Sequence, residues 1–300
     1  MKVTGWHNIA RRSDLAARPM WSAVVGRQRV LLVRQGDAVR AFEGACPHRG
    51  ADLGCGKLEG EDTVRCGLHG LRIGLRESSG RARWVPELPC LMLGDLVFVR
   101  LEAGADCGFA AAVAQLNQTH RIADPASQRI AVDYKMVIEN AFDEFHFVPV
   151  HEVTRLHPFQ VEPEPGGALS VTSRFTVPAS RWQRPRRGRD DVDVPFRATA
   201  YSPGLVITHM GGSRPYVVIT ASAPIDAQSC RVELAIATPI ETQPTSTDDV
   251  AYLSRQGLAG LEKDRVFWES TTDGICRLEP AEHAVRAFRQ FCVGFAGAGS

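Results

Sequence analysis

The sequence predicts an α+β protein with two domains, an all-β domain followed by a domain in which helices cover an antiparallel sheet. Residues 21–100 consist of short β-branched runs separated by turn residues, which is typical of a small all-β domain. Residues 169–238 hold four longer strand-like runs, and helical patterns follow at 248–271 and 280–292. Strands followed by helices favour an antiparallel sheet with helices on one face.

The first domain is predicted to end near Cys107, so that residues 1–107 form one domain and residues 108–300 the other. Gln35-Gly36-Asp37 is typical of a hairpin turn, and residues 103–114 are rich in Gly and Ala, which favours a loop between the domains. The short strands of the first domain are predicted at 22–25, 30–34, 39–42, 63–65 and 96–100.

Charge and composition exclude several classes of protein. The 300 residues carry a net charge of +1, and nothing in them resembles a nucleic-acid-binding module. The first residues lack the apolar core of a signal peptide, and no run approaches the roughly 18 apolar residues of a membrane span. We therefore expect a cytoplasmic protein that binds neither nucleic acid nor membrane, in which the eight cysteines are metal ligands or buried thiols.

Four residues of the first domain have the spacing of a metal site. Cys46 and His48 form one mixed pair, and Cys66 and His69 form a second pair further along the chain. Two thiolates and two imidazoles suit either zinc or an iron–sulfur cluster. Zinc modules usually present pairs of cysteines, so the mixed pairs, each on a Gly-containing loop between strands, favour the cluster over structural zinc.

A second candidate site lies in the stretch from Asn140 to His151. On a helix, Asn140, Asp143 and His146 would lie in a row on one face, whereas His151 would lie about 140° away from His146. Pro149 is expected to end or kink this helix and so to let His151 turn back. The alternative is that both histidines simply belong to the end of a core helix.

The helix predicted over 248–271 offers a third ligand for this site. Asp264 falls within the apolar arc of that helix, where an ionised carboxylate needs a metal or an arginine as its partner. Two histidines and one carboxylate form the facial triad of non-haem Fe(II) oxygenases. The alternative is a salt bridge from Asp264 to Arg255 or Arg265. The apolar arc is formed by Leu253, Gly257, Leu261, Asp264 and Trp268.

Together these motifs resemble the Rieske non-haem iron oxygenases, most closely the group that includes vanillate and dicamba O-demethylases. Gly67-Leu68 and Leu71 depart from the pattern usual in the family beside the second histidine of the cluster. The resemblance implies a Rieske [2Fe-2S] cluster held by Cys46, His48, Cys66 and His69, and a mononuclear Fe(II) held by His146, His151 and Asp264.

The resemblance also implies how the sites act together. Asp143 is expected to bridge His69 of one subunit to His146 of the next in a head-to-tail ring, commonly a homotrimer. Asn140 is expected to contact the iron ligands without binding the iron itself. A separate reductase, with or without a ferredoxin, would deliver electrons from NAD(P)H. With O2, the enzyme would hydroxylate or oxidatively demethylate a small, largely apolar ring compound.

Two other functions share most of these features. One is an iron-dependent desaturase or ring-forming oxidase of a biosynthetic pathway, and the other is a Rieske electron-transfer protein without catalytic iron. The substrate cavity is expected to be apolar and of ring size, with His157 the remaining histidine closest to it. The charged, Pro- and Gly-containing segment 181–189 is predicted to be a solvated loop. The predicted cavity residues are Phe142, Phe147, Val150, Phe159 and Trp268.

Overall fold

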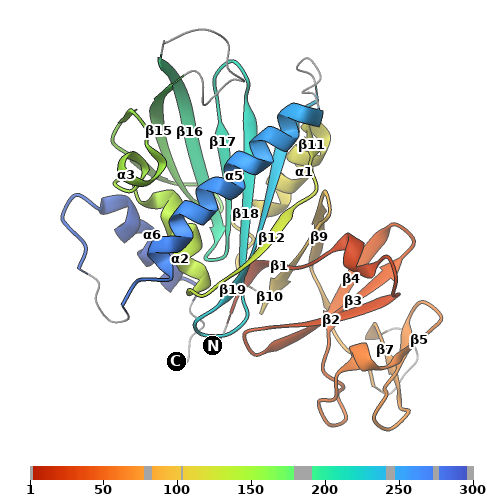
Figure 1. The fold of residues 1–300 in the computed structure, drawn as a ribbon. Helices are drawn as coiled ribbons and strands as arrows, with labels where there is room; N and C mark the ends of the chain where they lie inside the picture. The colour runs from red at the N-terminus through yellow and green to blue at the C-terminus, as the bar shows by residue number, and fades with distance from the viewer. Residues whose placement is uncertain are drawn as a thin grey trace. The chain divides into compact units, whose positions relative to one another are not determined.

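The computed structural model divides after Gly104 into two compact units, the first beginning at Met1 and the second running from Ala105 to Phe295. The structure describes residues 3–77, 83–102, 104–178, 191–240, 247–272 and 277–295. Figure 1 shows the strands of the first unit in red to orange, and those of the second in yellow through green to blue. Among the described residues, no helix is long and apolar enough to cross a membrane.

The described part of the first unit is built mainly of β-strands, as predicted, arranged in three small antiparallel sheets. Gly36 has a φ of 61° in the predicted hairpin turn, a conformation that glycine adopts without strain. The first sheet contains β1 (Gly5–Arg11), β9 (Cys90–Leu93) and β10 (Leu96–Leu101); the second contains β2 (Met20–Val25), β3 (Gln28–Gln35), β4 (Ala38–Glu43) and β8 (Glu87–Leu88); the third contains β5 (Lys57–Glu59), β6 (Thr63–Arg65) and β7 (Arg72–Gly74).

Strand β3 is buried on both faces, because neighbouring side chains of a strand point in opposite directions. Val30 and Leu32 pack into one hydrophobic core, and Leu31 and Val33 pack into another. The second core also contains the side chains of the two predicted cluster cysteines. The sheet that contains β3 therefore supports the loops that carry these cysteines.

The second unit is organised around an antiparallel sheet of nine strands in the described part of the chain. Seven of them form the path β11-β19-β18-β17-β16-β15-β13, with β12 paired to β19 and β14 paired to β15. The strands are β11 (His120–Ile122), β12 (Ala126–Ile130), β13 (Arg155–Leu156), β14 (Gln160–Pro163), β15 (Leu169–Pro178), β16 (Asp191–Ser202), β17 (Leu205–Met210), β18 (Tyr216–Pro224) and β19 (Cys230–Pro239).

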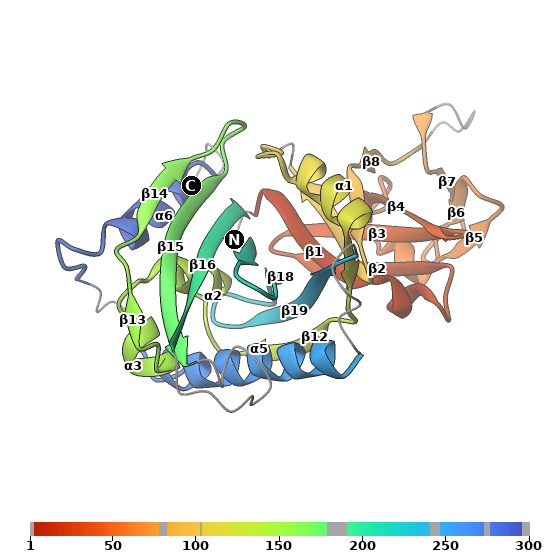
Figure 2. The same cartoon turned by 90° about the horizontal axis from the view of Figure 1, so that it is seen from above.

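One face of this sheet is covered by helix α5 (Thr247–Trp268), which lies across strands β17 to β19 in Figures 1 and 2. The strand registers place three rows of side chains on this covered face. The rows are Phe196, Met210 and Tyr216; Ala198, Thr208 and Val218; and Ala200, Val206, Thr220 and Leu234.

The predicted α+β class and the two C-terminal helices are confirmed, whereas the loop predicted between the domains is wrong. Helix α6 (His283–Val293) overlaps the second predicted helical segment. The Gly- and Ala-rich segment predicted as a loop contains helix α1 (Phe109–Thr119), whose Phe109, Val113 and Leu116 are buried. The segment 181–189, predicted as a solvated loop, lies outside the described residues.

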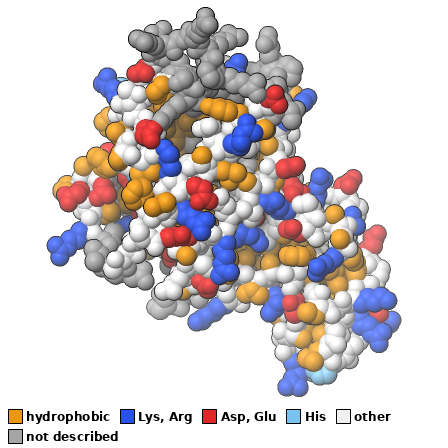
Figure 3. Space-filling model, in the orientation of Figure 1, with side chains coloured by type: hydrophobic (Ala, Val, Ile, Leu, Met, Phe, Trp, Pro, Cys, Tyr) orange, Lys and Arg blue, Asp and Glu red, His pale blue; other side chains and the backbone are white. Residues whose placement is uncertain are grey.

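Positive and negative side chains are interspersed on the face drawn in Figure 3. Lys and Arg side chains lie among Asp and Glu side chains, and no continuous basic patch covers the described residues of that face. This mixed distribution accompanies a net charge of +1 for the whole chain.

Candidate metal centres and the pocket beside one of them

The first candidate centre is built from two loops with the same hydrogen-bond pattern. In the first loop, the backbone N–H of Cys46 donates to the carbonyl of Ala51 over 2.8 Å, and that of Gly50 donates to the carbonyl of Cys46 over 2.7 Å. Gly50 has a φ of 71°, which an L-residue rarely adopts. His48 lies within this closed turn.

The second loop repeats this geometry. The backbone N–H of Cys66 donates to the carbonyl of Leu71 over 2.8 Å, and that of Gly70 donates to the carbonyl of Cys66 over 2.9 Å. Gly70 has a φ of 67°, close to that of its counterpart in the first loop. His69 lies within this turn, so each loop presents one cysteine and one histidine from the same kind of backbone turn.

The two loops bring the four side chains together with the thiols inside and the imidazoles outside. Cys46 and Cys66 are 3% and 2% exposed, whereas His48 and His69 are exposed. The centroids of the two imidazole rings are 4.8 Å apart. Two buried thiols beside two clustered imidazoles suit a Rieske cluster, in which the cysteines hold one iron and the histidines hold the other.

Asp52, which sequence reasoning missed, stabilises the first loop through hydrogen bonds to its side chain. One carboxylate oxygen accepts hydrogen bonds from Ser22 Oγ at 2.8 Å and Arg29 Nη1 at 2.6 Å. The other accepts one from the backbone N–H of Gly54 at 2.8 Å. Ser22 and Arg29 lie far from Asp52 in sequence, and only the Asp-x-Gly spacing gave a local signal of a side chain that closes a turn.

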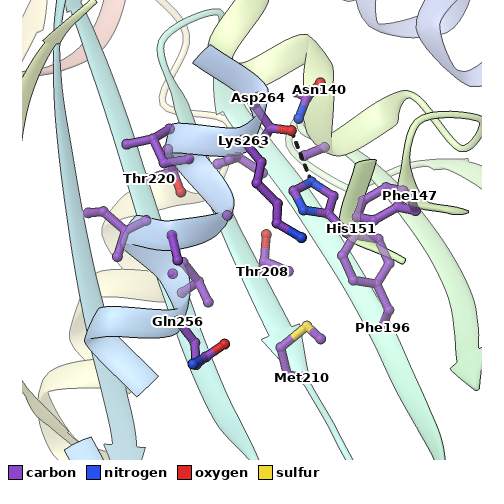
Figure 4. Close-up of a pocket in the computed structure, with 18 of the residues that line it drawn as sticks. Asn140, Phe147, His151, Phe196, Thr208, Met210, Thr220, Gln256, Lys263 and Asp264 are labelled. Carbon is purple, nitrogen blue, oxygen red and sulfur yellow. Dashed lines mark ion pairs between the residues drawn. The ribbon is translucent and has the colours of Figure 1, made fainter. Parts of the chain in front are cut away.

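The second candidate centre contains His146, His151 and Asp264, whose potential ligand atoms all lie within 4.8 Å of one another. Asp264 Oδ1 lies 3.0 Å from Nε2 of His151 and 4.0 Å from Nε2 of His146. Figure 4 shows Asp264 on helix α5 facing His151, which comes from a separate segment of the chain. The structure thus brings together all three residues predicted as iron ligands.

The carboxylate of Asp264 is the strongest sign that a cation belongs here. Asp264 is 8% exposed, and its Oδ1 has no hydrogen-bond partner among the described residues. Arg265 instead contacts Glu262 at 3.6 Å and Glu269 at 2.9 Å, on another side of the helix, so it is not the partner that the alternative interpretation required. A buried carboxylate without a partner is costly, and a cation between it and the imidazoles would remove that cost.

The ring of His146 is oriented by contacts at both of its nitrogens. Its Nδ1 donates to the carbonyl of Asp143 over 2.6 Å, which leaves the lone pair on Nε2. Burial lowers the pKa of His146, although the nearby carboxylate of Asp264 opposes this effect. Asn140 Nδ2 lies 3.0 Å from Nε2, so the amide is beside the ligand nitrogen.

The single helix predicted around Asn140 and His146 is wrong, because this segment is broken into separate turns. Helix α2 (Tyr134–Glu139) is followed by a short 3-10 turn (Asn140–Phe142), and helix α3 (Phe147–His151) begins after a break. Asp143 is extended, with φ −89° and ψ 100°, so the row of residues on one helix face does not exist. Pro149 lies in the first turn of α3, where a missing N–H is tolerated, and therefore does not cause the break.

The break is stabilised by the side chain of Asp143. Its Oδ1 accepts a hydrogen bond from the backbone N–H of Phe145 at 3.0 Å, and its Oδ2 lies 3.7 Å from Nδ1 of His146. The side chain keeps 30% of its surface exposed. Asp143 therefore closes the turn that presents His146, and part of its carboxylate remains accessible.

A cavity of about 480 Å³ lies beside the second centre, between helix α5 and the covered face of the sheet. All five residues of the predicted apolar arc of α5 line it, including Gly257 and Trp268. A Cβ at Gly257 would lie 3.1 Å from Cδ2 of Leu234, so this glycine lets the helix approach the sheet. The cavity is also lined by Phe147, Phe175, Phe196, Met210 and Val218.

The prediction of individual cavity residues is only partly confirmed. Phe147 and Trp268 line the cavity, whereas His157, Phe142, Val150 and Phe159 do not. Phe142 stacks on Phe288, with ring centroids 4.9 Å apart, and Phe159 stacks on Phe196, with centroids 5.7 Å apart. These rings support the cavity wall from behind.

Comparison with known families gives a match for each unit of the chain. Residues 5–99 match the Rieske [2Fe-2S] domain, and residues 109–291 match the 3-ketosteroid 9alpha-hydroxylase C-terminal domain. The second match alone covers more than half of the chain.

Individual relatives extend this similarity over nearly the whole chain. The methylxanthine N3-demethylase NdmB of Pseudomonas putida is 25% identical over 273 residues, which are 80% of this chain and 74% of that protein. The crystal structure of dicamba monooxygenase bound to 3,6-dichlorosalicylic acid has a TM-score of 0.71 at 17% identity, covering 97% and 96% of the two chains. The structure of Pseudomonas putida CBB5 NdmB has a TM-score of 0.66 at 20% identity, covering 95% and 88%. At these identities the two structural matches establish a shared fold.

The contacts of Asp52 generate a first prediction. Replacing Asp52 by Ala removes three hydrogen bonds to a charged group and should lower the free energy of unfolding by about 1–3 kcal/mol. The loop that carries Cys46 and His48 should hold its metal less firmly, so purified protein should contain less iron and less acid-labile sulfide. Asp37→Ala, at an exposed hairpin turn, is the matched control. Equal stability and equal iron content in the two variants would contradict this role.

Proposed function

Because this chain belongs to the Rieske non-haem iron oxygenases, we propose that its two candidate centres hold the two iron cofactors of that family. The cofactors are a Rieske [2Fe-2S] cluster and a mononuclear Fe(II). The proposed cluster ligands are Cys46, His48, Cys66 and His69, and the proposed ligands of the mononuclear iron are His146, His151 and Asp264. The observation that carries the second assignment is the buried Oδ1 of Asp264, which faces two imidazoles without a hydrogen bond.

The enzyme is an oxidoreductase that uses O2 and electrons from NAD(P)H on a small, largely apolar ring compound. In hydroxylation, R–H, O2, two electrons and two protons give R–OH and water. When the hydroxylated carbon is a methyl group on nitrogen or oxygen, the product loses formaldehyde, and the net reaction is demethylation. Among the relatives, the names of NdmB and dicamba monooxygenase describe a demethylase and a monooxygenase.

The side chains around the proposed iron site have separable tasks. The bound iron would supply the redox chemistry with O2. The carbonyl of Asp143 holds the proton of His146 on Nδ1, so the lone pair that would bind iron is on Nε2. Phe147, Phe175 and Phe196 form one aromatic wall of the cavity, in which neighbouring ring centroids lie 4.6 to 5.8 Å apart.

The alternative functions differ in the metal or in the product. A Rieske electron-transfer protein would need no mononuclear iron, and the three clustered ligands beside a cavity argue against it. A desaturase or ring-forming oxidase would use the same ligands, so product analysis separates it from a hydroxylase or demethylase. We favour hydroxylation or demethylation because one relative is named a demethylase and the other a monooxygenase.

We further propose that the subunits form a head-to-tail ring, a homotrimer, served by a separate reductase with or without a ferredoxin. In this arrangement Asp143 would link His146 to the cluster ligand His69 of the next subunit. The exposed imidazole of His69 and the 30% exposure of Asp143 support such a contact. Asn140 would act on the iron side, because its amide lies 3.0 Å from Nε2 of His146.

The metal content tests the two assignments. Purified protein should carry about three irons per chain, two in the cluster and one mononuclear. Asp264→Ala should lose the mononuclear iron and all turnover, while the Rieske absorption spectrum is retained. Glu262→Ala, an exposed position on the same helix, should keep all of the iron. Two irons per chain in the unmodified protein, with an intact Rieske spectrum, would favour the electron-transfer alternative.

The inter-subunit route predicts a specific effect at Asp143. Asp143→Asn should leave both metals bound and the cluster reducible, while product formation falls by about tenfold or more because the carboxylate link is lost. Metal analysis, cluster reduction by dithionite and single-turnover product yield measure the three quantities. If the main effect is instead loss of the mononuclear iron, Asp143 only holds His146 in position.

Mixed oligomers test the ring directly. Asp264→Ala chains lack mononuclear iron and His69→Ala chains lack the cluster, so their hetero-oligomers should regain activity only when electrons cross between subunits. A mixture of Asp264→Ala and His146→Ala chains, both without mononuclear iron, is the control and should stay inactive. An inactive hetero-oligomer of the first pair, with each chain retaining its other metal site, would refute the inter-subunit route.

A further inference from the structure

Two threonines interrupt the otherwise apolar face of the sheet that forms the cavity floor. Thr208 on β17 pairs with Val218, and Thr220 on β18 pairs with Val206, so the two threonines are diagonal neighbours on the same face. Both line the cavity. The positions around them hold alanine and other apolar residues, so the hydroxyls are local exceptions in an apolar surface.

The hydroxyls of Thr208 and Thr220 are not used by the fold. Neither has a hydrogen-bond partner among the described residues. By contrast, Thr199 on the neighbouring strand β16 shares a 2.8 Å hydrogen bond with Ser170. A hydroxyl that faces a cavity without a protein partner must bind water or a ligand, since an unsatisfied polar group is costly once water is displaced.

A third uncharged polar group faces the threonines from the opposite wall. Gln256 lies on helix α5 and lines the same cavity as Thr208. Figure 4 shows Gln256 on the helix and Thr208 on the sheet, on either side of the space above Met210. A primary amide presents a C=O acceptor and an N–H donor side by side. A cyclic amide also has one C=O and one N–H side by side, so the two amides can form a pair of hydrogen bonds.

The charged groups of the cavity are already engaged. Its charged lining residues are Lys263 and Asp264. The ammonium of Lys263 lies 3.2 Å from Oε1 of Glu152, the residue that follows His151. Asp264 faces the two imidazoles. Apart from Tyr216 and from Asn140, whose amide contacts His146, the uncharged polar side chains that line the cavity are Thr208, Thr220 and Gln256.

We propose that Thr208, Thr220 and Gln256 form a polar subsite that selects an uncharged, flat ring compound with a cyclic-amide edge. This inference rests on the proposed function and narrows its substrate class. The ring carbonyl accepts from a threonine hydroxyl, and the amide edge pairs with the carboxamide of Gln256, while the phenylalanine wall packs on the apolar part of the ring. A ring of the same size without polar groups leaves the hydroxyls unsatisfied and binds more weakly.

Binding of three bicyclic probes to the purified holoenzyme tests the subsite without turnover. The probes are 2-quinolone, which has a cyclic-amide edge, naphthalene, which has no hydrogen-bonding group, and 2-naphthoate, which carries a carboxylate. Isothermal titration calorimetry should find the smallest Kd for 2-quinolone. Thr208→Val and Thr220→Val should each raise that Kd by about two- to tenfold, as expected for one hydrogen bond, and leave the Kd of naphthalene equal or lower.

Thr172→Val is the matched control, because Thr172 lies on β15 of the same sheet but does not line the cavity. It should change none of the three Kd values. Thermal unfolding of each variant should match the unmodified protein, since valine has the shape of threonine.

Three outcomes would overturn the subsite. Equal Kd values for naphthalene and 2-quinolone, unaffected by both valine variants, would make the cavity purely apolar. Tightest binding of 2-naphthoate, lost in Lys263→Met, would make the ammonium the selecting group. Failure of all three probes to bind would also refute the proposal. Because no electrons are supplied, these results are independent of iron content and turnover, which test the proposed function separately.

Discussion

The catalytic half of the molecule depends on one electrostatic requirement, the compensation of a buried carboxylate. Asp264 is nearly inaccessible and points at two imidazoles rather than at an arginine or lysine. A divalent cation bound by the carboxylate and the two imidazoles would compensate this buried charge. The fold places this arrangement next to a cavity, where a ligand can reach the cation without disturbing the core.

Helix α5 couples the metal centre to the cavity. The helix carries Asp264 and also supplies one wall of the cavity, so its position determines both the geometry of the ligands and the space left for a substrate. Gly257 allows this close approach, because a Cβ there would lie 3.1 Å from Cδ2 of Leu234 in the sheet. A larger side chain at Gly257 would push the helix, and with it Asp264, away from the sheet.

The features that sequence reasoning predicted are those with a local signal, such as the spacing of a motif or the periodicity of a helix. The inward position of Asp264 follows from the 3.6-residue repeat of α5, which depends on that segment alone. The break between Asn140 and Phe147 was missed because it depends on the Asp143 side chain, which accepts the N–H of Phe145 in competition with helix formation. Helix α1 was missed because its Ala-rich composition resembles a linker until tertiary contacts bury its apolar side chains. The contacts of Asp52 come from residues distant in sequence, which no local pattern reveals.

The two candidate centres differ in exposure, and the difference matches their proposed chemistry. His48 and His69 are exposed above buried thiols, so an electron can enter or leave at the surface without any opening of the domain. His146 and Asp264 lie inside, where burial lowers the pKa of the imidazole and the lining of the adjacent cavity is largely apolar. Asp143 belongs to both environments: its carbonyl orients the buried histidine while its carboxylate remains partly accessible. A single turn of the chain therefore joins a buried imidazole to a carboxylate that solvent can reach.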